Sequence, residues 1–540
     1  MSIAKKLKEC QQNEKVSYTN ELHDALIEKN SVNFWKCWRS KFKSHSKCEE
    51  IEGCINPNRI ANKFCDHFSA AYSAHNRDTA DALSREYFNE RERYVGHSLS
   101  YSDNFDTELI DNIINDLKRG KAAGLDGLCS EHLIFCCPII SCILASLFNV
   151  MLHCHYVPTQ FGQSYTVPIP KPKNIHGKSL ECNDFRGIAI SCVISKILEY
   201  AILRRFNKYF ITGENQFGFK KNLGCTQAIH TVRNLIERYT RGGSTVNICS
   251  IDLSKAFDKT NHHGVLLKLM KRNMPRSIIL LLEYWLQNTW SCVKWEGCYS
   301  PLFKLNYGVR QGSVLSPVLF ALYIDDLYVS PSMLNSIILY ADDILIISPS
   351  ILGLQNLYDF CELFFSKLDL SINAKKSFCV RIGPRYNINC VNITSNSGGR
   401  IAWTEKIRYL GIFILNAAKF KASNEESRRA FHRSLNAIFG RVGRVASEHV
   451  TLHLVNSKCL PMLLYATEAC KISKHDIFSL DFIYNRFLMK LFKTNNINII
   501  NDCIKFFGLS LPSTLIKTRT DKFINKYNSI DNSLCRQFLH

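Results

Sequence analysis

The chain has 540 residues, of which 46% are hydrophobic and 21% are charged, and this balance excludes a largely disordered protein. The length exceeds that of one small core and predicts two to four lobes. The formal net charge of +21 attracts polyanions, so nucleic acid is the leading class of partner.

Residues 1–95 are rich in Lys, Glu and Asn, and their apolar residues recur at intervals of three and four. This spacing is typical of helices, so we expect a helical, basic N-terminal extension or linker. The opening MSIAKKLKECQQNEKV lacks the apolar core of a secretory signal. We therefore expect an intracellular protein.

Cysteine is frequent but shows no zinc-like or disulfide-like spacing. The 23 cysteines are spread through apolar runs, with no CxxC pair. This pattern predicts reduced thiols that act as small core residues. The examples are Cys136, Cys137, Cys142 and Cys249.

Two helices are predicted before the first strands. The spacing of Leu109, Ile113 and Leu117 predicts a helix that ends at Gly120 and is followed by the GLDG turn. Residues 133–151, LIFCCPIISCILASLFNVM, form an uncharged run long enough to span a bilayer. Because this run contains Pro138 and polar residues and has no second such run after it, we expect a buried core helix and no membrane association.

From about residue 165 to 415, short strand-like runs alternate with helical ones, which predicts an α/β or α+β domain. Beyond residue 420 the pattern becomes helical and basic. One stripe of that region is apolar and predicts a buried helix face, made of Phe431, Leu435, Ile438 and Val442. Four arginines lie mostly off the stripe and are candidate phosphate contacts: Arg429, Arg433, Arg441 and Arg444.

An aspartate ends the most strand-like segment of the chain. Residues 246–263 read VNICSIDLSKAFDKTNHH, and alternation in a strand sends Ile248 and Asp252 to one face and Cys249 and Ile251 to the other. Asp252 therefore comes at the end of a buried strand that offers no other reason for a charge.

Two further aspartates interrupt an apolar run. The segment SIILYADDILIIS predicts two short strands with Asp342 and Asp343 at the turn between them. If these strands neighbour the strand before Asp252, three carboxylates converge and repel one another. Two magnesium ions would neutralise them, because Mg²⁺ prefers oxygen ligands and is commonly shared with substrate phosphates.

A glycine-containing loop lies between the two acidic sites. In NYGVRQGSVLSPVLFALYIDDL, residues 306–327, Gly308 and Gly312 allow close backbone approach, and Gln311 can hydrogen-bond a base or the backbone. Ser316 and Pro317 predict a helix start, with Pro in the first turn.

Taken in order, SIDLSKAFDK, GVRQGSVLSPVLF, YADD, LSINAKKS and IRYLGIFI resemble the successive palm motifs of reverse transcriptases of LINE-like, non-LTR retrotransposons, in particular the jockey-like branch. Earlier segments resemble that branch's finger motifs: KAAGLDGL, TVPIPKPK, NDFRGIAISCVISKILEY and NQFGFKKNLGCTQAIHTV. The resemblance covers residues 118 to 415. It implies an α+β right-hand polymerase with fingers, a palm built on an antiparallel sheet, and a helical thumb.

The resemblance also implies a role for each matching residue. Asp252, Asp342 and Asp343 match the catalytic, metal-binding aspartates, joined at the metal by the carbonyl of Leu253, and Lys376 matches a general acid, with Lys375 as the neighbouring alternative. The matches for nucleotide binding are Lys171 or Lys173, Arg186, Phe257 at the sugar 2′ position, Gln311 and Gly312. Tyr409, Leu410 and Gly411 match the hairpin that grips the primer.

The chain departs from the family at the fingers. GFKKNLGC stands where Arg, Gly and Ser or Thr are usual, and Gly187 replaces a proline in RGIAIS, which puts template or nucleotide binding in doubt. No endonuclease motif precedes the polymerase motifs, so we expect a reading frame that lacks the N-terminal endonuclease of autonomous elements.

The prediction is an RNA-directed DNA polymerase with an extension at 1–95, fingers and palm at 96–415 and a basic helical thumb at 416–540. It implies Mg²⁺ with Mn²⁺ as a substitute, an RNA template, a DNA primer or target and deoxynucleotides, in the nucleus or cytoplasm. No stable protein partner is inferred. Three alternatives stay open: a catalytically decayed or co-opted nucleic-acid-binding remnant, an intron-maturase-like protein, and an RNA-directed RNA polymerase, which Phe257 and YADD disfavour.

Overall fold

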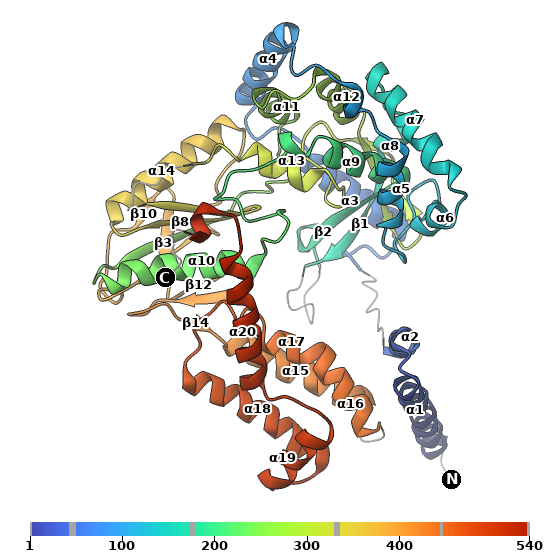
Figure 1. Cartoon of the computed structure of the whole chain (residues 1–540), viewed down its shortest axis with the longest axis vertical. Helices are drawn as coiled ribbons and strands as arrows, with labels where there is room; N and C mark the ends of the chain where they lie inside the picture. Colours follow the sequence, from blue (N-terminus) through green and yellow to red (C-terminus); the bar gives the residue numbers. More distant parts are fainter. Residues whose placement is uncertain (1–2, 43–49, 172–179, 329–334, 443–445, 537–540) are drawn as a thin grey trace.

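The structure is a computed structural model that describes residues 3–42, 50–171, 180–328, 335–442 and 446–536. Helices form most of the molecule and pack around three antiparallel or mixed sheets (Figure 1). The predicted α+β class is therefore confirmed.

The N-terminal residues are helical, as expected, but their helices pack at two different places. They form α1 (Ile3–Ile27), α2 (Ser31–Phe42), α3 (Pro57–Ala71) and α4 (Arg77–Arg93). On the first pair, Tyr18, Leu22 and Phe34 share a core with Phe431 and Val450 of the C-terminal helices. Helix α3 packs on the first sheet and α4 on α11 (His262–Lys271). The domain boundary at residue 95 stays a prediction.

The first sheet belongs to the region expected to form the fingers. Its strand order is β2-β1-β4-β5, with β6 also paired to β4. The strands are β1 (Gln163–Pro170), β2 (Phe185–Ser191), β4 (Trp290–Trp295), β5 (Cys298–Tyr299) and β6 (Phe303–Lys304). Six helices of the same region pack on one another, and α8 among them contacts β1: α5 (Thr107–Asn115), α6 (Ser130–Ile134), α7 (Ile139–Cys154), α8 (Thr159–Gly162), α9 (Val193–Arg205) and α12 (Arg276–Gln287).

Two helix predictions in this region need correction. Helix α5 ends at Asn115, well before Gly120; its buried residues are Ile110, Ile113 and Ile114, and of the residues between its end and Gly120 only Leu117 packs against the core. The run at 133–151 breaks at Pro138, and α7 buries only one face. No helix in the described part of the chain is long and apolar enough to cross a membrane.

The outer face of α7 is apolar and exposed, which contradicts the prediction of a buried core helix. The exposed side chains are Ile139, Ile143, Leu147 and Val150. Cys136, Cys137 and Cys142 are exposed in the same region, so their predicted role as core residues is wrong, whereas Cys249 is buried as expected.

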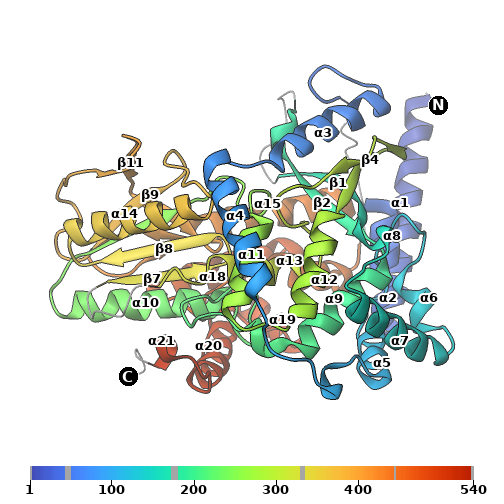
Figure 2. The same cartoon turned by 90° about the horizontal axis from the view of Figure 1, so that it is seen from above.

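The second sheet has six strands in the order β10-β11-β9-β3-β8-β7. These are β3 (Val246–Ile251), β7 (Ser336–Tyr340), β8 (Asp343–Ser348), β9 (Phe378–Ile382), β10 (Ile393–Thr394) and β11 (Arg400–Trp403). Figure 2 shows α14 (Ile351–Lys367) on one face and α10 (Cys225–Arg241) on the other. The predicted alternation along β3 is confirmed, because Cys249 and Ile251 join the core under α14 and Ile248 joins the core under α10.

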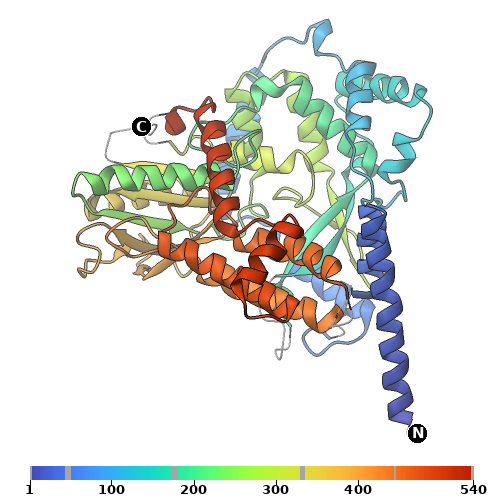
Figure 3. The same cartoon turned by 60° about the horizontal axis from the view of Figure 1, so that its bottom comes forward.

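The C-terminal quarter begins with a small sheet and continues as helices. The sheet is β12 (Lys406–Tyr409), β13 (Ile412–Leu415) and β14 (Ala422–Ser423), and the helices are α15 (Glu425–Val442), α16 (Glu448–Leu454), α17 (Leu460–Leu463), α18 (Lys474–Phe492), α19 (Ile497–Phe506), α20 (Pro512–Asn528) and α21 (Ser533–Arg536). The predicted apolar stripe on α15 is buried as expected. Figure 3 shows the red C-terminal segment returning to the green helix α10, which α21 contacts.

Candidate active site

The three predicted aspartates lie at one edge of the six-stranded sheet. Strands β3 and β8 pair antiparallel, and the last pair of the ladder is Ile251 with Ile344. Asp252 directly follows β3, and Asp343 is the first residue of β8. Asp342 occupies the two-residue turn between β7 and β8. The two strands are therefore neighbours, as the predicted convergence of the three carboxylates requires.

Burial raises the pKa of all three carboxylates, and the charge of a neighbouring aspartate raises it further at Asp343 and Asp252. Burial, followed by the negative charges of Asp342 and Asp252, raises the pKa of Asp343 to about 6. Burial raises the pKa of Asp342 and of Asp252, and the charge of Asp342 adds to the rise at Asp252. Asp342 and Asp343 nonetheless reach solvent. A solvent-accessible cluster whose negative charges oppose one another is short of positive charge.

Two predicted cations lie within electrostatic reach of the cluster. Arg186 lowers the pKa of both Asp342 and Asp343, and Lys376 lowers that of Asp252. Lys375 has no such effect on these three aspartates. The positions of the charges therefore favour Lys376 over its neighbour.

The residues present suit a divalent cation that brings ligands of its own. Within the described ranges, no group of three or more His, Cys, Asp or Glu side chains is arranged to enclose a metal ion. Mg²⁺ commonly takes only one or two carboxylates from the protein and completes its shell with water and phosphate oxygens. Asp342 and Asp343 lack sufficient positive charge nearby, so they fit a site in which the protein gives the ion only some of its ligands.

The backbone of Asp252 is hydrogen-bonded to the loop that carries the LSINAKKS motif. The Asp252 amide donates to Ser377 Oγ at 3.1 Å, and the Asn373 amide donates to the Asp252 carbonyl at 2.8 Å. Leu253 and Ile372 face each other in an isolated β-bridge, whose two hydrogen bonds run between the flanking residues. The Leu253 carbonyl, which is predicted to join the metal, takes no part in these bonds. Sequence reasoning missed Ser377, although it stands in a quoted motif.

The loop before α13 (Ser316–Tyr323) packs tightly on β2. Gly312 has φ +124°, and a Cβ there would lie 2.4 Å from the Ala189 carbonyl oxygen. The Ala189 amide donates to the Gln311 carbonyl at 2.7 Å, and Gln311 Nε2 donates to Asp258 Oδ1 at 3.1 Å. The predicted close approach at Gly312 is thus to the protein's own backbone, and Pro317 lies in the first turn of α13 as predicted.

A buried carboxylate anchors the same loop and was not foreseen. Glu199 of α9 is 1% exposed. Its Oε2 accepts from the amides of Val314 and Leu315 at 2.5 and 2.8 Å, and Oε1 lies 3.8 Å from Arg310. Glu199 stands in the quoted motif NDFRGIAISCVISKILEY, but its partners are more than a hundred residues away, so no local pattern signals them.

Phe257 and the predicted cations of the fingers lie in different surroundings. Phe257 is half-buried with its ring centroid 4.5 Å from that of Phe320. Arg186 is exposed on β2, where it pairs with Ile169 of β1. Lys171 donates to the Asn183 carbonyl just beyond β1, and Lys173 lies outside the described residues.

The departure at Gly187 has a local explanation. A Cβ at this position would lie 2.7 Å from Thr166 Cγ2 and 3.2 Å from Phe68 Cζ. Phe68 belongs to α3, which covers this face of the sheet. Gly187 therefore makes room for the N-terminal helix that packs on β2.

The residues predicted to grip the primer form the β12–β13 hairpin. Leu410 and Gly411 make its turn with φ +44° and +86°. Tyr409 is buried as a whole residue, with only 2% of its surface exposed, so its ring is not available at the surface. Arg408 is exposed on the same strand and lowers the pKa of Asp343. Sequence reasoning did not single out Arg408.

The candidate thumb arginines differ in their surroundings. Arg429 pairs with Glu425 and Glu426 on its own helix. Arg433 and Arg441 are exposed on α15, and Arg444 lies outside the described residues. Arg429, Arg433 and Arg441 are not among the charges that shift the pKa values of the three aspartates.

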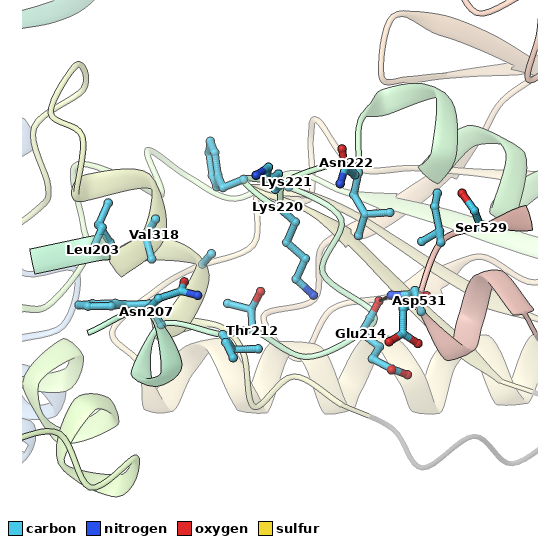
Figure 4. A pocket seen from close by; sticks show the side chains of 18 of the residues that line it. Leu203, Asn207, Thr212, Glu214, Lys220, Lys221, Asn222, Val318, Ser529 and Asp531 are labelled. Atoms are coloured by element: carbon cyan, nitrogen blue, oxygen red, sulfur yellow. Dashed lines mark hydrogen bonds between the residues drawn. The ribbon is translucent and has the colours of Figure 1, made fainter. Parts of the chain in front are cut away.

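A cavity of about 800 Å³ in the described part of the chain does not contain the aspartates. It lies between the segment at 211–223 and the end of α20. Figure 4 shows the Lys220 side chain crossing it from the side of Lys221 and Asn222 toward Thr212. There Lys220 donates a hydrogen bond to the Gly213 carbonyl, so this lysine connects two parts of the cavity wall.

Comparison with known proteins agrees with this geometry. Residues 169–414, which contain all three aspartates, match the sequence model of the family described as reverse transcriptase (RNA-dependent DNA polymerase). The chain carries a reverse transcriptase domain. It holds the predicted catalytic, nucleotide-binding and primer-grip residues, from Lys171 to Gly411.

Curated relatives of the reverse transcriptase domain come from mobile elements. The chain is 27% identical over 336 residues to the RNA-directed DNA polymerase from mobile element jockey of Drosophila funebris, covering 58% of this chain and 35% of that protein. It is 24% identical over 407 residues to the probable RNA-directed DNA polymerase from transposon BS of Drosophila melanogaster, covering 70% and 44%. The chain spans less than half the length of these relatives.

A solved structure was also matched. Apo telomerase from Candida tropicalis aligns with a TM-score of 0.35 and 14% identity, over 62% of this chain and 61% of that one.

Proposed function

We propose that this chain is an RNA-directed DNA polymerase of a non-LTR mobile element, which adds deoxynucleotides to a primer 3′-hydroxyl on an RNA template. The observation that carries the proposal is the convergence of Asp252, Asp342 and Asp343 at adjacent strand ends inside the reverse transcriptase domain. The net charge of +21 supports it, and so does the RNA-directed DNA polymerase activity after which the jockey and BS relatives are named.

The proposed chemistry is an in-line phosphoryl transfer. Divalent ions, Mg²⁺ or Mn²⁺, held by the three aspartates and the Leu253 carbonyl would supply positive charge at the attacking and leaving oxygens. Arg186 is proposed to bind the triphosphate, since a guanidinium offers a two-pronged contact to phosphate. Lys376 is proposed to give a proton to the leaving pyrophosphate.

The remaining contacts follow the same proposal. Lys171 or Lys173 would assist Arg186 at the triphosphate, and Phe257 would exclude a ribose 2′-hydroxyl. Gln311 and Gly312 would border the new base pair. The hairpin of Tyr409, Leu410 and Gly411 would hold the primer end, with Arg408 directed at its phosphate. The thumb arginines Arg429, Arg433, Arg441 and Arg444 would contact the duplex backbone, an interaction that weakens with salt.

Primer extension on an RNA template tests the proposal. The purified chain should incorporate deoxynucleotides with Mg²⁺, and Asp342→Asn should reduce incorporation at least a thousandfold, because it removes one negative charge at the reacting atoms. Asp66→Asn changes an exposed aspartate on α3 and serves as the matched control. Residual incorporation within tenfold of wild type in Asp342→Asn would refute the assignment.

The same assay separates the competing functions. A folded chain that binds RNA but extends no primer would indicate a nucleic-acid-binding remnant. Preference for ribonucleotides would indicate an RNA-directed RNA polymerase. In the proposed enzyme, Phe257→Ala should relax the preference for deoxynucleotides at least tenfold, whereas a Phe257 that only packs on Phe320 would change stability and leave the preference intact.

A further inference from the structure

The turn that carries Asp342 has an unusual backbone. Tyr340 pairs with Asp343, so Ala341 and Asp342 are the two loop residues of the β7–β8 hairpin. Ala341 has φ +56°. The first loop residue of such tight hairpins is normally glycine, because a Cβ crowds the backbone at positive φ. Something outside the hairpin must therefore hold Ala341 in this conformation.

The finger segment NQFGF supplies that contact. It runs beside β7, where the Phe217 amide donates to the Leu339 carbonyl and the Leu339 amide donates to the Asn215 carbonyl, both at 2.8 Å. Gln216 lies between these two bonds and forms a parallel bridge with Leu339. The segment thus acts as a short extra strand on the edge of the sheet, next to the turn.

The Gln216 side chain reaches the turn itself. It is 0% exposed, and its Oε1 accepts from the Ala341 amide at 2.9 Å and from the Gly218 amide at 2.8 Å. A Cβ on Gly218 would lie 2.5 Å from the Ala341 nitrogen. Gly218 therefore leaves the space through which the glutamine meets Ala341.

Only one end of this carboxamide is used. Among the described residues, the buried Gln216 Nε2 has no hydrogen-bond partner. A buried polar atom without a partner carries a desolvation cost. The side chain therefore makes its hydrogen bonds through Oε1, which accepts from Ala341 in the turn and from Gly218 in its own segment.

We infer that Gln216 is a positioning residue for the catalytic turn: its Oε1 holds the Ala341 amide at positive φ and so aims the Asp342 carboxylate. The residue acts through Asp342 and does not touch the substrate. The role in catalysis rests on the proposed polymerase function, whereas the grip on the turn stands on the geometry alone. The fingers segment and the catalytic hairpin are thereby joined by one side chain.

The first test is amide hydrogen exchange, which needs no activity. In Gln216→Leu the Ala341 amide loses its acceptor, so exchange in the peptide spanning residues 336–348 should become at least tenfold faster. Gln216→Glu keeps an oxygen acceptor for the Ala341 amide and replaces the unpartnered amide with a carboxyl group, whose protonated form burial favours, so it should retain protection. Unchanged exchange in Gln216→Leu would overturn the inference.

Gln227 provides a matched control. It is also buried, and its Oε1 accepts from the Gly224 amide at 3.0 Å, at the start of α10 rather than at the turn. Gln227→Leu should leave exchange at 336–348 unchanged. If it speeds that exchange as much as Gln216→Leu does, the effect is general loosening and the inference is refuted. Should Gln216→Leu fail to fold, the shorter Gln216→Asn makes the same comparison.

The second test uses primer extension and a rescue. Gln216→Leu should lower kcat at least tenfold with KM for deoxynucleotide within twofold, because the substrate contacts are untouched. Adding Ala341→Gly should restore kcat at least threefold, since glycine takes positive φ without help. A purely structural glutamine predicts no rescue. If wild type extends no primer, the proposed function fails, and the exchange comparison still decides the positioning role.

Discussion

Glu199 makes a demanding prediction, because one buried carboxylate holds the loop that precedes α13. Glu199→Ala would leave Arg310 buried without its counter-charge and the Val314 and Leu315 amides without an acceptor. Breaking a buried ion pair costs about 3–5 kcal/mol. Each orphaned buried amide adds a cost of about 1–3 kcal/mol, which overlaps with the first. We expect a loss of about 4 kcal/mol in the free energy of unfolding.

Urea denaturation followed by far-UV circular dichroism measures this loss. Glu199→Gln keeps an oxygen for the two amides, so it should cost only about 1–2 kcal/mol. The double variant Glu199→Ala, Arg310→Met should be about 2 kcal/mol more stable than Glu199→Ala, because it removes the unpaired charge. Glu283→Gln is the control: Glu283 is also buried, but its partner Arg91 reaches solvent, so the cost should be about 1 kcal/mol.

Two results would refute this reasoning. A loss below about 1 kcal/mol in Glu199→Ala would mean that the loop finds other partners. Equal stability of the single and double variants would mean that Arg310 is not left as an uncompensated charge.

Three further predictions concern the same domain. Burial lowers the pKa of His262 to about 4, and its Nε2 bonds the Gly308 carbonyl. Because only the unfolded chain takes up this proton between pH 6.5 and 4, the histidine removes about 2 kcal/mol of stability on going from pH 7 to pH 5. His262→Gln should lack that part of the acid sensitivity in urea titrations at the two pH values, and an identical sensitivity would contradict the assignment. Gly312→Ala places a Cβ 2.4 Å from the Ala189 oxygen at φ +124°, so it should lose about 2 kcal/mol of stability and incorporate deoxynucleotides at least tenfold more slowly. A normal rate would show that the loop can shift. Lys376→Ala should lower the rate of incorporation about a hundredfold while Lys375→Ala stays within threefold, and the reverse order in single-turnover assays would transfer the role to the neighbour.

Local pattern predicted much of the sheet and the strand ends. The alternation along 246–251 placed Cys249 and Ile251 on the opposite face from Ile248, and the structure buries them in different cores. The apolar stripe of α15 is buried as its spacing predicts. Such periodicity reports which face is buried, so it succeeds wherever one face packs on a core.

The prediction of a buried core helix failed at α7, whose sequence is uncharged on all sides. Its inner face packs through Leu144 and Phe148, while Ile139 and Ile143 on the outer face remain exposed. Hydropathy alone cannot tell a helix buried on all sides from one with an unpartnered apolar face, because the neighbours are set by tertiary packing.

Some residues of the candidate site could be predicted from the sequence and others could not. The three aspartates carried their own signal, since charges in apolar strands need an explanation. Gln216, Glu199 and Ser377 carried none, because their work is to accept backbone hydrogen bonds from residues distant in sequence. Only the folded backbone shows which amide each oxygen meets.

The packing of α1 on the C-terminal helices has a consequence for how the protein is made. His23 bonds Ser447, and the two are 424 residues apart. At about 5–20 residues per second of synthesis, the first helix waits roughly 20–80 s for the surface it packs on. During that interval Tyr18 and Leu22 have no core to join. Nascent chains stalled before residue 431 should therefore be open to proteolysis at their N-terminus, and chaperones that bind apolar segments would find their first site there.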